Sequence, residues 1–297
     1  MANDESTKKT YYKKATGKAL ETVEKHSSDH ELKLFGSCFC PFVQRVWISL
    51  ELKQLDYQYI ETDAQRIFGH NPFPLPVPYN DITLAAQNRS TVLTITQVDP
   101  YEKPQQLLEV NPRGLVPALR HGDWGCYEST VLMEYLEDLQ KGEALLPSDP
   151  KLKAHSRLWS DHINRNIVPG FYRYLQAQDE KPQIEYAEEF KEQISKLVDA
   201  ADDSGPFFLG EKPTFVDVQM APWVIRLRTV LQPYRGWPKP EGGSRWARWV
   251  EAIEQNHAVR ATTSTDELYH SSYERYAENR PNTSQVQQAV NSGRGLP

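Results

Sequence analysis

The order strand, loop, helix, strand in residues 31–62 constrains the fold of this chain more than any other feature. Residues 31–37 (ELKLFGS) alternate apolar and polar side chains as a short strand does, and residues 41–55 place apolar side chains at helical spacing behind a first-turn proline. Residues 56–62 (DYQYIET) predict a second strand. Because strand–helix–strand crossovers within one sheet are right-handed, we expect a parallel βαβ unit here.

The remaining ordered segments divide into a mixed part and a helical part. Residues 103–139 predict a short helix, two strands joined by a tight turn and an amphipathic helix, whereas the pattern from 151 to about 280 is helical. A chain of 297 residues is long enough for two ordinary domains. The sequence therefore predicts an α/β domain followed by an all-α domain.

Three segments fit neither predicted domain. Residues 1–30 are polar with only weak helical periodicity, and we interpret them as an N-terminal extension. Residues 63–102 are rich in proline and read as an insertion, because a connection of this length is uncommon inside a compact domain. Residues 281–297 have almost no apolar side chains to anchor them, which predicts a disordered tail. The predicted domains are thus 31–145 and 146–280.

Charge and hydropathy exclude several classes of partner. The 34 basic and 40 acidic residues are mixed along the chain and give a net charge of −6, which argues against nucleic-acid binding. No apolar run approaches the roughly 18 residues of a membrane-spanning helix, and the first twenty residues lack the apolar core of a secretory signal. We therefore expect a cytoplasmic protein that binds a small molecule and no membrane. In that compartment its three cysteines should be free thiols.

Two of those cysteines, Cys38 and Cys40, lie in the loop between the first strand and the first helix. A thiolate at a helix N-terminus is stabilised by the aligned peptide dipoles and free N–H groups. Cys40 directly precedes Pro41 and the helix, so it is the better candidate nucleophile, against the ordinary alternative of an inert buried cysteine. The C-x-C spacing, with no second His or Cys pair nearby, argues against zinc, and we predict no metal.

Four motifs in this order make the chain similar to the cytosolic glutathione transferases, and among them to the Omega class, which places a cysteine in the active site. The motifs are CPFV (40–43), NPRGLVPAL (111–119), YEST (127–130) and PTFVDVQMAP (213–222). The last begins with a capping-box pattern, Thr214 with Asp217. The resemblance implies a thioredoxin-like N-terminal domain, an all-helical C-terminal domain, glutathione as co-substrate and a homodimer.

Carried to the matching positions, the resemblance implies a set of site residues with Cys40 as the nucleophile. The residues implied for glutathione binding are Phe42, Lys103, Val116, Pro117, Glu128 and Ser129, with a cis peptide bond before the proline. The residues implied for the second-substrate pocket are Trp223, Tyr172 and Tyr174. Without the resemblance, Glu128–Ser129 reads equally well as a helix cap, Val116–Pro117 as a turn at a strand edge, and the aromatic residues as core.

The resemblance implies a glutathione-dependent thiol transferase that forms a mixed disulfide between Cys40 and glutathione. Its reactions would be deglutathionylation and the reduction of dehydroascorbate or α-glutathionyl ketones. Two alternatives stay open. Ser37 or Cys38 could carry the chemistry in place of Cys40, a serine favouring conjugation over thiol transfer, or the fold could bind hydrophobic small molecules without turnover.

Overall fold

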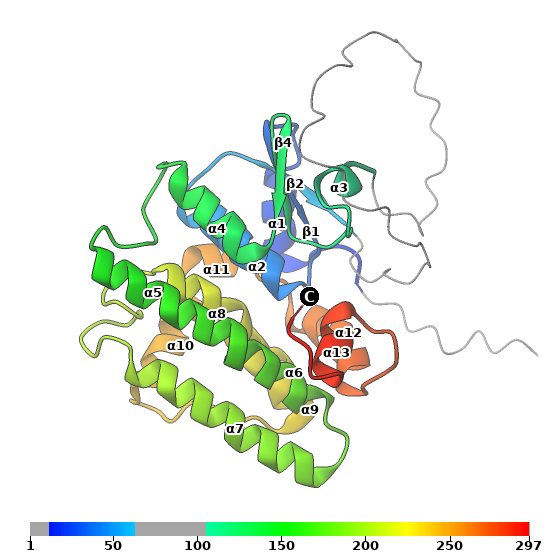
Figure 1. Cartoon of the computed structure of the whole chain (residues 1–297), viewed down its shortest axis with the longest axis vertical. Helices are drawn as coiled ribbons and strands as arrows, with labels where there is room; N and C mark the ends of the chain where they lie inside the picture. The colour runs from blue at the N-terminus through cyan, green and yellow to red at the C-terminus, as the bar shows by residue number, and fades with distance from the viewer. Residues whose placement is uncertain (1–11, 63–104, 297) are drawn as a thin grey trace, which may run out of the picture.

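The computed structural model describes residues 12–62 and 105–296. Its sheet has the strand order β2-β1-β3-β4, in which β1 and β2 are parallel and the other neighbours are antiparallel (Figure 1). The strands are β1 (Leu32–Gly36), β2 (Gln58–Glu61), β3 (Ala118–His121) and β4 (Trp124–Tyr127). Helix α2 (Pro41–Leu52) connects the two parallel strands, which confirms the predicted βαβ unit.

Two further helices belong with the sheet. Helix α3 (Gln105–Val110) packs against β3 and β4, and α4 (Ser129–Asp138) follows β4 and packs against α2. The turn between β3 and β4 contains Gly122 at φ 61°, a left-handed conformation that favours glycine. The predicted pair of strands joined by a tight turn is therefore confirmed.

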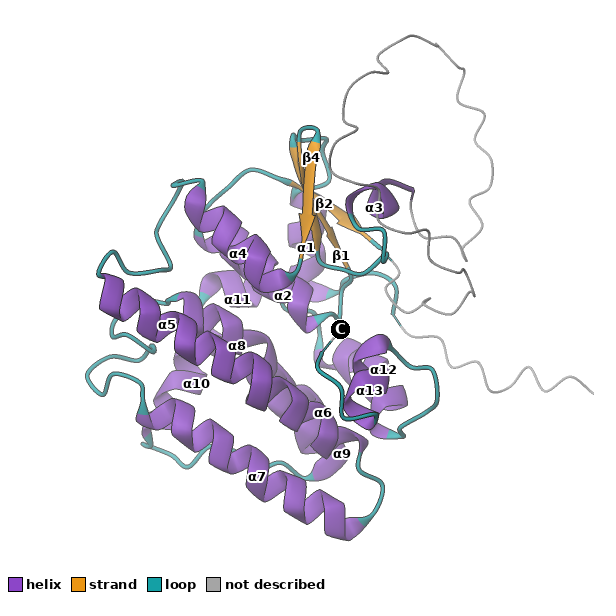
Figure 2. Cartoon of the chain, viewed as in Figure 1, coloured by secondary structure: helices purple, strands orange, loops and turns teal. Residues whose placement is uncertain are grey.

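The rest of the described chain is helical (Figure 2). Its helices are α5 (Pro150–His162), η2 (Ile163–Ile167), α6 (Val168–Gln176), α7 (Glu180–Asp199), α8 (Phe215–Arg226), η3 (Leu227–Leu231), α9 (Gln232–Arg235), α10 (Arg245–Gln255), α11 (His257–Ala261), α12 (Asp266–Ala277) and α13 (Gln285–Asn291). The segments η2 and η3 are single π-helical turns between α-helices. The prediction of a mixed α/β part followed by a helical part is confirmed.

Helices α2 and α8 form the core that the two parts share. They pack against each other, and 9 of the 12 residues of α2 and all 12 of α8 are buried. A helix that is buried all round belongs in the middle of a structure. The predicted capping box starts α8: Thr214 N donates to Asp217 Oδ2 over 2.7 Å. Asp217 Oδ1 also accepts from Trp249 Nε1 at 2.6 Å, which fixes α10 to this helix start.

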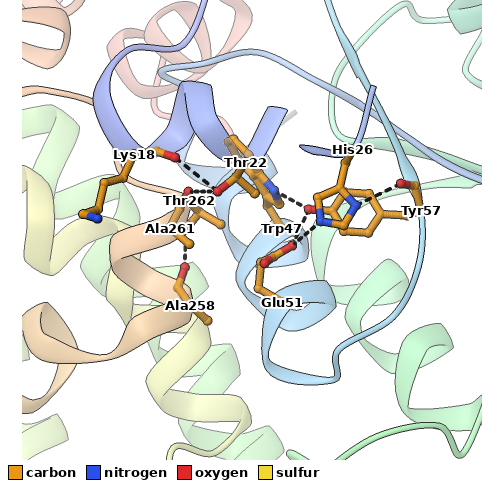
Figure 3. A network of polar contacts seen from close by, with 9 residues as sticks. All are labelled: Lys18, Thr22, His26, Trp47, Glu51, Tyr57, Ala258, Ala261 and Thr262. Carbon is orange, nitrogen blue, oxygen red and sulfur yellow. Dashed lines mark hydrogen bonds and ion pairs between the residues drawn. The ribbon is translucent and has the colours of Figure 1, made fainter. Parts of the chain in front are cut away.

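Part of the predicted N-terminal extension is instead built into the fold. Residues Gly17–Lys25 form helix α1, which packs against α11. Ala19 and Thr22 are buried, and the hydroxyl of Thr22 donates to the carbonyl of Ala261 over 2.7 Å (Figure 3). The buried face of α1 consists of small side chains, so its hydrophobic periodicity is weak and the sequence did not reveal its packing.

A polar network attaches the end of α1 to α2 (Figure 3). His26 Nε2 lies 3.2 Å from Glu51 Oε1, and the His26 ring stacks on Tyr57 with centroids 3.9 Å apart. The hydroxyl of Tyr57 donates to Glu51 over 2.6 Å and accepts from Trp47 Nε1 over 2.6 Å. Burial acts to raise the pKa of Glu51, but His26 and the Tyr57 hydroxyl hold it below its usual value. The network therefore favours an ionised Glu51.

The tail predicted to be disordered also differs in the structure, which has helix α13 packed against α6. Thr283 and Gln287 are almost completely buried. Gln287 Nε2 donates to the carbonyl of Arg280 over 2.6 Å, and its Oε1 accepts from Thr283 N at 3.0 Å. Buried polar side chains anchor this segment, so a prediction based on its low hydropathy was wrong.

The predicted insertion at 63–102 and the candidate Lys103 lie outside the described residues. Within the described residues, no helix combines the length and the hydropathy needed to span a bilayer. The candidate residues Cys40, Val116 and Ser129 lie where the sheet-containing part meets the helical part.

Candidate active site

A cavity of about 860 Å³ lies between the sheet-containing part and the helices. Seven of the site residues implied by the resemblance line it: Cys40, Phe42, Val116, Pro117, Glu128, Ser129 and Tyr172. They come from the start of α2, the loop before β3, the start of α4 and helix α6. Side chains that are distant in sequence thus meet at one concave site, as expected of a small-molecule pocket.

Cys40 is the N-cap residue of α2, and its thiol donates to the carbonyl oxygen of Val116 over 3.8 Å. Burial raises the pKa of Cys40, while the N–H groups of Val43 and Phe42 and two nearby guanidinium groups lower it. The net shift is upward. The helix N-terminus therefore favours the thiolate of Cys40, as expected, but burial has the larger and opposite effect on its pKa.

The two rival nucleophiles do not line the cavity. Ser37 and Cys38 are buried, at 4% and 6% exposure, and neither is among the cavity-lining residues. The thiol of Cys38 donates to the carbonyl oxygen of Tyr12 over 3.5 Å, away from the lining groups. Cys40 is therefore the nucleophile candidate that a ligand in the cavity can reach.

The loop before β3 presents backbone to the cavity. The peptide bond between Val116 and Pro117 is cis, as the resemblance implies, and both residues line the cavity. Asn111 Nδ2 donates to the carbonyl of Leu115 over 2.9 Å and holds the loop in place. The backbone of Val116 is thereby fixed next to the thiol of Cys40.

Glu128 and Ser129 lie at the start of α4. Glu128 has φ 76°, a conformation that is rare for residues other than glycine and that is often found at functional sites. It is the N-cap residue of α4 but makes no side-chain capping hydrogen bond; its carboxylate pairs instead with Arg113 at 3.1 Å. The geometry of Glu128 therefore does not fit the alternative of a simple helix cap.

Two of the aromatic residues implied for the pocket wall lie in the core instead. Trp223 is completely buried behind Phe42, with ring centroids 5.4 Å apart, and Tyr174 donates to the carbonyl of Arg235 over 2.7 Å. Neither lines the cavity, whereas Tyr172 does. Residues two apart on a helix point about 200° apart, so Tyr172 and Tyr174 cannot face the same pocket.

Most of the helical wall of the cavity was not predicted from the sequence. This wall includes Tyr273 and Tyr276 of α12, Asn164 and Arg165 in the π-helical turn η2, and residues 284–296. A π-helical turn often marks a functional site, but nothing in a sequence of this composition identifies one. Residues 284–296 contain one pattern that predicts packing. Val286 and Val290 are four residues apart and would lie on the same face of a helix.

Within residues 12–62 and 105–296, no group of three or more His, Cys, Asp or Glu side chains is arranged to hold a metal ion. The polar groups that line the cavity include a thiol, a cis peptide, a helix N-terminus, guanidinium groups and the carboxylate of Glu128. They suit an anionic ligand with peptide-like hydrogen-bonding groups and a sulfur atom placed near Cys40.

Comparison with known proteins gives the same picture of the two parts. Residues 39–139 match the family described as "Glutathione S-transferase, N-terminal domain", and residues 169–252 match "Glutathione S-transferase, C-terminal domain". The first segment lies within the sheet-containing part and the second within the helical part. They confirm the predicted thioredoxin-like domain followed by an all-helical domain.

Similar proteins include members of the Omega class. The structure of glutathione transferase Omega 3C from Trametes versicolor is 36% identical with a TM-score of 0.72, over 90% of this chain and 98% of that one. Glutathione S-transferase omega-1 from Sus scrofa is 24% identical over 67% of this chain and 68% of its own length. Rice GST1, solved in complex with glutathione, is 24% identical with a TM-score of 0.63, over 82% of this chain and 96% of that one.

Proposed function

The chain belongs to the glutathione transferase family, and from this premise we propose that it is an Omega-like thiol transferase with Cys40 as nucleophile and glutathione as co-substrate. The observation that carries the proposal is the position of Cys40: it caps α2 and shares one cavity with the backbone of Val116 and with Ser129. The 36% identity to an Omega-class transferase supports the same class. Such chemistry needs reduced glutathione, so we place the enzyme in the cytoplasm.

In this proposal the sheet-containing part binds glutathione. The backbone of Val116 pairs with the cysteinyl residue of the tripeptide, alongside Phe42 and Pro117. The hydroxyl of Ser129 and the first N–H groups of α4 bind the γ-glutamyl carboxylate, because a helix N-terminus attracts anions. Glu128 binds the adjacent ammonium group by a charge-assisted hydrogen bond. Lys103 would bind the glycyl carboxylate.

The first half of the reaction transfers glutathione to the enzyme. The thiolate of Cys40 attacks the glutathione sulfur of a glutathionylated substrate, the old sulfur–sulfur bond breaks, and the substrate leaves as a thiolate that takes a proton from water. A second glutathione thiolate then attacks the glutathione sulfur of the mixed disulfide. Oxidised glutathione leaves, and Cys40 returns to the thiolate.

Two other reactions use the same intermediate. With an α-glutathionyl ketone, Cys40 attacks the glutathione sulfur, the carbon–sulfur bond breaks, and its electron pair becomes an enolate that is protonated to the ketone. With dehydroascorbate, the Cys40 thiolate adds to a carbonyl carbon; a first glutathione thiolate then attacks the Cys40 sulfur, the carbon–sulfur bond breaks, and its electron pair leaves with ascorbate. Both reactions thus leave a disulfide between Cys40 and glutathione. A further glutathione thiolate resolves it and leaves as oxidised glutathione, since no second cysteine lines the cavity within the described residues.

The test is the mass of the intact protein after incubation with oxidised glutathione, combined with a glutathione-dependent thiol-transfer assay. We expect one glutathione adduct and turnover in wild type, and neither in Cys40→Ser. Cys38→Ser is the matched control and should behave as wild type, because Cys38 is buried and its thiol donates to the carbonyl oxygen of Tyr12. An adduct that persists in Cys40→Ser would transfer the chemistry to another residue. A protein that binds glutathione but shows neither adduct nor turnover would be a carrier of hydrophobic small molecules.

We also propose that the protein is a homodimer. Trp124 on β4, Val131 on α4 and Leu158 on α5 are large apolar side chains with exposures of 45%, 50% and 63%. An ion pair between Glu134 and Arg157 at 2.7 Å joins α4 to α5 beside them. Such side chains gathered on neighbouring elements indicate a protein interface. Val131→Asp should convert a dimer into a monomer in analytical ultracentrifugation, and a wild type that sediments as a monomer would refute this.

A further inference from the structure

Two arginines lie completely buried between the two parts of the protein. Arg45 on α2 is 1% exposed and Arg226 at the end of α8 is 0% exposed. Burial of a cation is unfavourable by several kcal/mol unless an anion compensates it. Every hydrogen-bond acceptor of these two guanidinium groups within the described residues is neutral. The structure therefore contains two buried positive charges without a carboxylate partner among those residues.

Arg45 points from the sheet-containing part towards the helical part. Its Nε donates to the carbonyl of Gln219 over 3.0 Å, and its Nη1 donates to Asn164 Oδ1 over 2.8 Å. Its Nη2 is buried and has no hydrogen-bond partner in the structure. The guanidinium lies 4.3 Å from the ring centroid of Trp223, and the residue lines the cavity together with Cys40.

Arg226 points across the same boundary in the opposite direction. Its Nη2 donates to the carbonyl of Phe39, the residue before Cys40, over 2.8 Å. Its Nη1 donates to Gln44 Oε1 and its Nε to the hydroxyl of Tyr273, each over 2.7 Å. Arg226 therefore holds the backbone that presents Cys40. Arg45 lies on α2, five residues after Cys40.

We propose that Arg45 and Arg226 are the built-in counter-charges of the Cys40 thiolate, an inference that rests on Cys40 being the nucleophile of the proposed function. When the thiol releases its proton to water, the remaining anion compensates positive charge that the fold has already buried. The two guanidinium groups and the thiolate together then carry one net positive charge. It favours a substrate that is itself an anion, as glutathione adducts are.

Four phenols also lie near Cys40: Tyr59 on β2, Tyr172 on α6, and Tyr273 and Tyr276 on α12. The other charged side chains on the cavity wall are Glu128, Arg165, Arg173 and Arg294. The first three pair with Arg113, Asp161 and Glu189. Burial raises the pKa of all four phenols, so they are neutral at physiological pH, and Arg45 and Arg226 are the buried charges beside the thiol. Burial lowers the pKa of Arg45 to about 9, against an opposing effect of Cys40, so the guanidinium stays charged at neutral pH.

The test is the pH dependence of Cys40 alkylation by iodoacetamide, measured without glutathione and followed at Cys40 by peptide mapping. In Arg45→Met and in Arg226→Met we expect the midpoint to rise by about one pH unit or more, the usual effect of removing an opposite charge. Arg45→Lys keeps the charge and should restore the midpoint. Arg228→Met is the control, because that arginine already pairs with Glu254 and Asp266.

A second measurement remains informative if a methionine variant fails to fold. Cys40→Asp introduces a permanent anion at the thiol position, and Cys40→Asn introduces a neutral side chain of the same shape. If buried positive charge surrounds this position, the aspartate variant should have the higher melting temperature at pH 7. When Arg45→Lys is added to both variants, the aspartate variant should still have the higher melting temperature.

Two results would overturn the inference: an alkylation midpoint that does not move in either folded methionine variant, or an aspartate variant that melts below the asparagine variant. The alkylation experiment does not depend on turnover. A wild type that shows the shifts but no thiol transfer would refute the proposed function alone, whereas a wild type that turns over but shows no shifts would refute this inference alone.

Discussion

The cavity has two walls of different construction. The wall from the sheet-containing part presents backbone groups and helix ends: the cis peptide before Pro117, the start of α2 at Cys40 and the start of α4 at Ser129. The opposite wall consists of side chains from η2, α6 and α12 and of residues 284–296. Substitution of side chains changes the shape of a wall made of backbone groups little, whereas it directly changes the shape of a wall made of side chains. We therefore expect the first wall to set the chemistry and the second to set the range of substrates.

The largest effect should come from the nucleophile on the backbone wall. Cys40→Ser should lower the thiol-transfer rate by about 10³-fold or more, because a serine hydroxyl cannot form the mixed disulfide. Steady-state kinetics with a glutathionylated peptide measure the loss. A comparable loss in Cys38→Ser would show that the two cysteines act together and would contradict the placement of Cys38 outside the cavity.

A smaller effect on the same wall should follow Ser129→Ala. Removal of one hydrogen bond to a carboxylate weakens binding by about 2 kcal/mol, which corresponds to roughly a thirtyfold rise in KM for glutathione. The maximal rate should change much less, because Ser129 would bind the γ-glutamyl end and not the reacting sulfur. Titration of glutathione at saturating second substrate separates the two constants. An unchanged KM would exclude Ser129 from the glutathione site.

The side-chain wall should respond differently. Val290→Ala removes apolar surface from the segment that closes the cavity, and it should change kcat/KM for a bulky second substrate by roughly twofold to tenfold. The KM for glutathione should stay within about twofold, since the backbone wall is intact. A rise in that KM equal to the change in kcat/KM would show that the two walls do not act separately.

The smallest effect on catalysis should come from a change outside both walls. Glu51→Gln should leave the kinetic constants unchanged and lower the stability at pH 7 by about 1 kcal/mol, through the weakened contacts to His26 and Tyr57. The pKa of Glu51 lies below its ordinary value of 4.5, so ionisation stabilises the folded state above that pH and the contribution disappears as the pH falls through the lowered pKa. Denaturant titrations at pH 7 and pH 3 should show a larger difference between wild type and the variant at pH 7 than at pH 3.

The backbone wall was largely predictable from the sequence, and the side-chain wall was not. Turns, prolines and helix starts have local signals, so short motifs and the resemblance they carry pointed to Cys40, Pro117 and Ser129, all of which line the cavity. The side-chain wall depends on which face of a helix meets the cavity. For that reason only Tyr172 of the three predicted aromatic residues lines the cavity, whereas Trp223 and Tyr174 lie in the core.

The packing of residues 1–30 and 281–297, the two segments outside the predicted domains, was not predicted for one physical reason. Helix α1 buries small side chains such as Ala19, and the segment around α13 is anchored by Gln287 and Thr283 through hydrogen bonds. Neither produces the apolar periodicity from which packing is predicted. The buried arginines were missed because Arg45 and Arg226 read as solvent-facing residues in an amphipathic pattern, and their burial follows only from the contact between α2 and α8.

The part played by residues 284–296 in lining the cavity has a consequence for biosynthesis. The ribosome makes Cys40 early and these residues more than two hundred positions later, and domains fold in that order. A nascent chain therefore displays a thiol whose surroundings are still incomplete. Until residues 284–296 are made, that thiol lacks the part of the cavity lining that they supply.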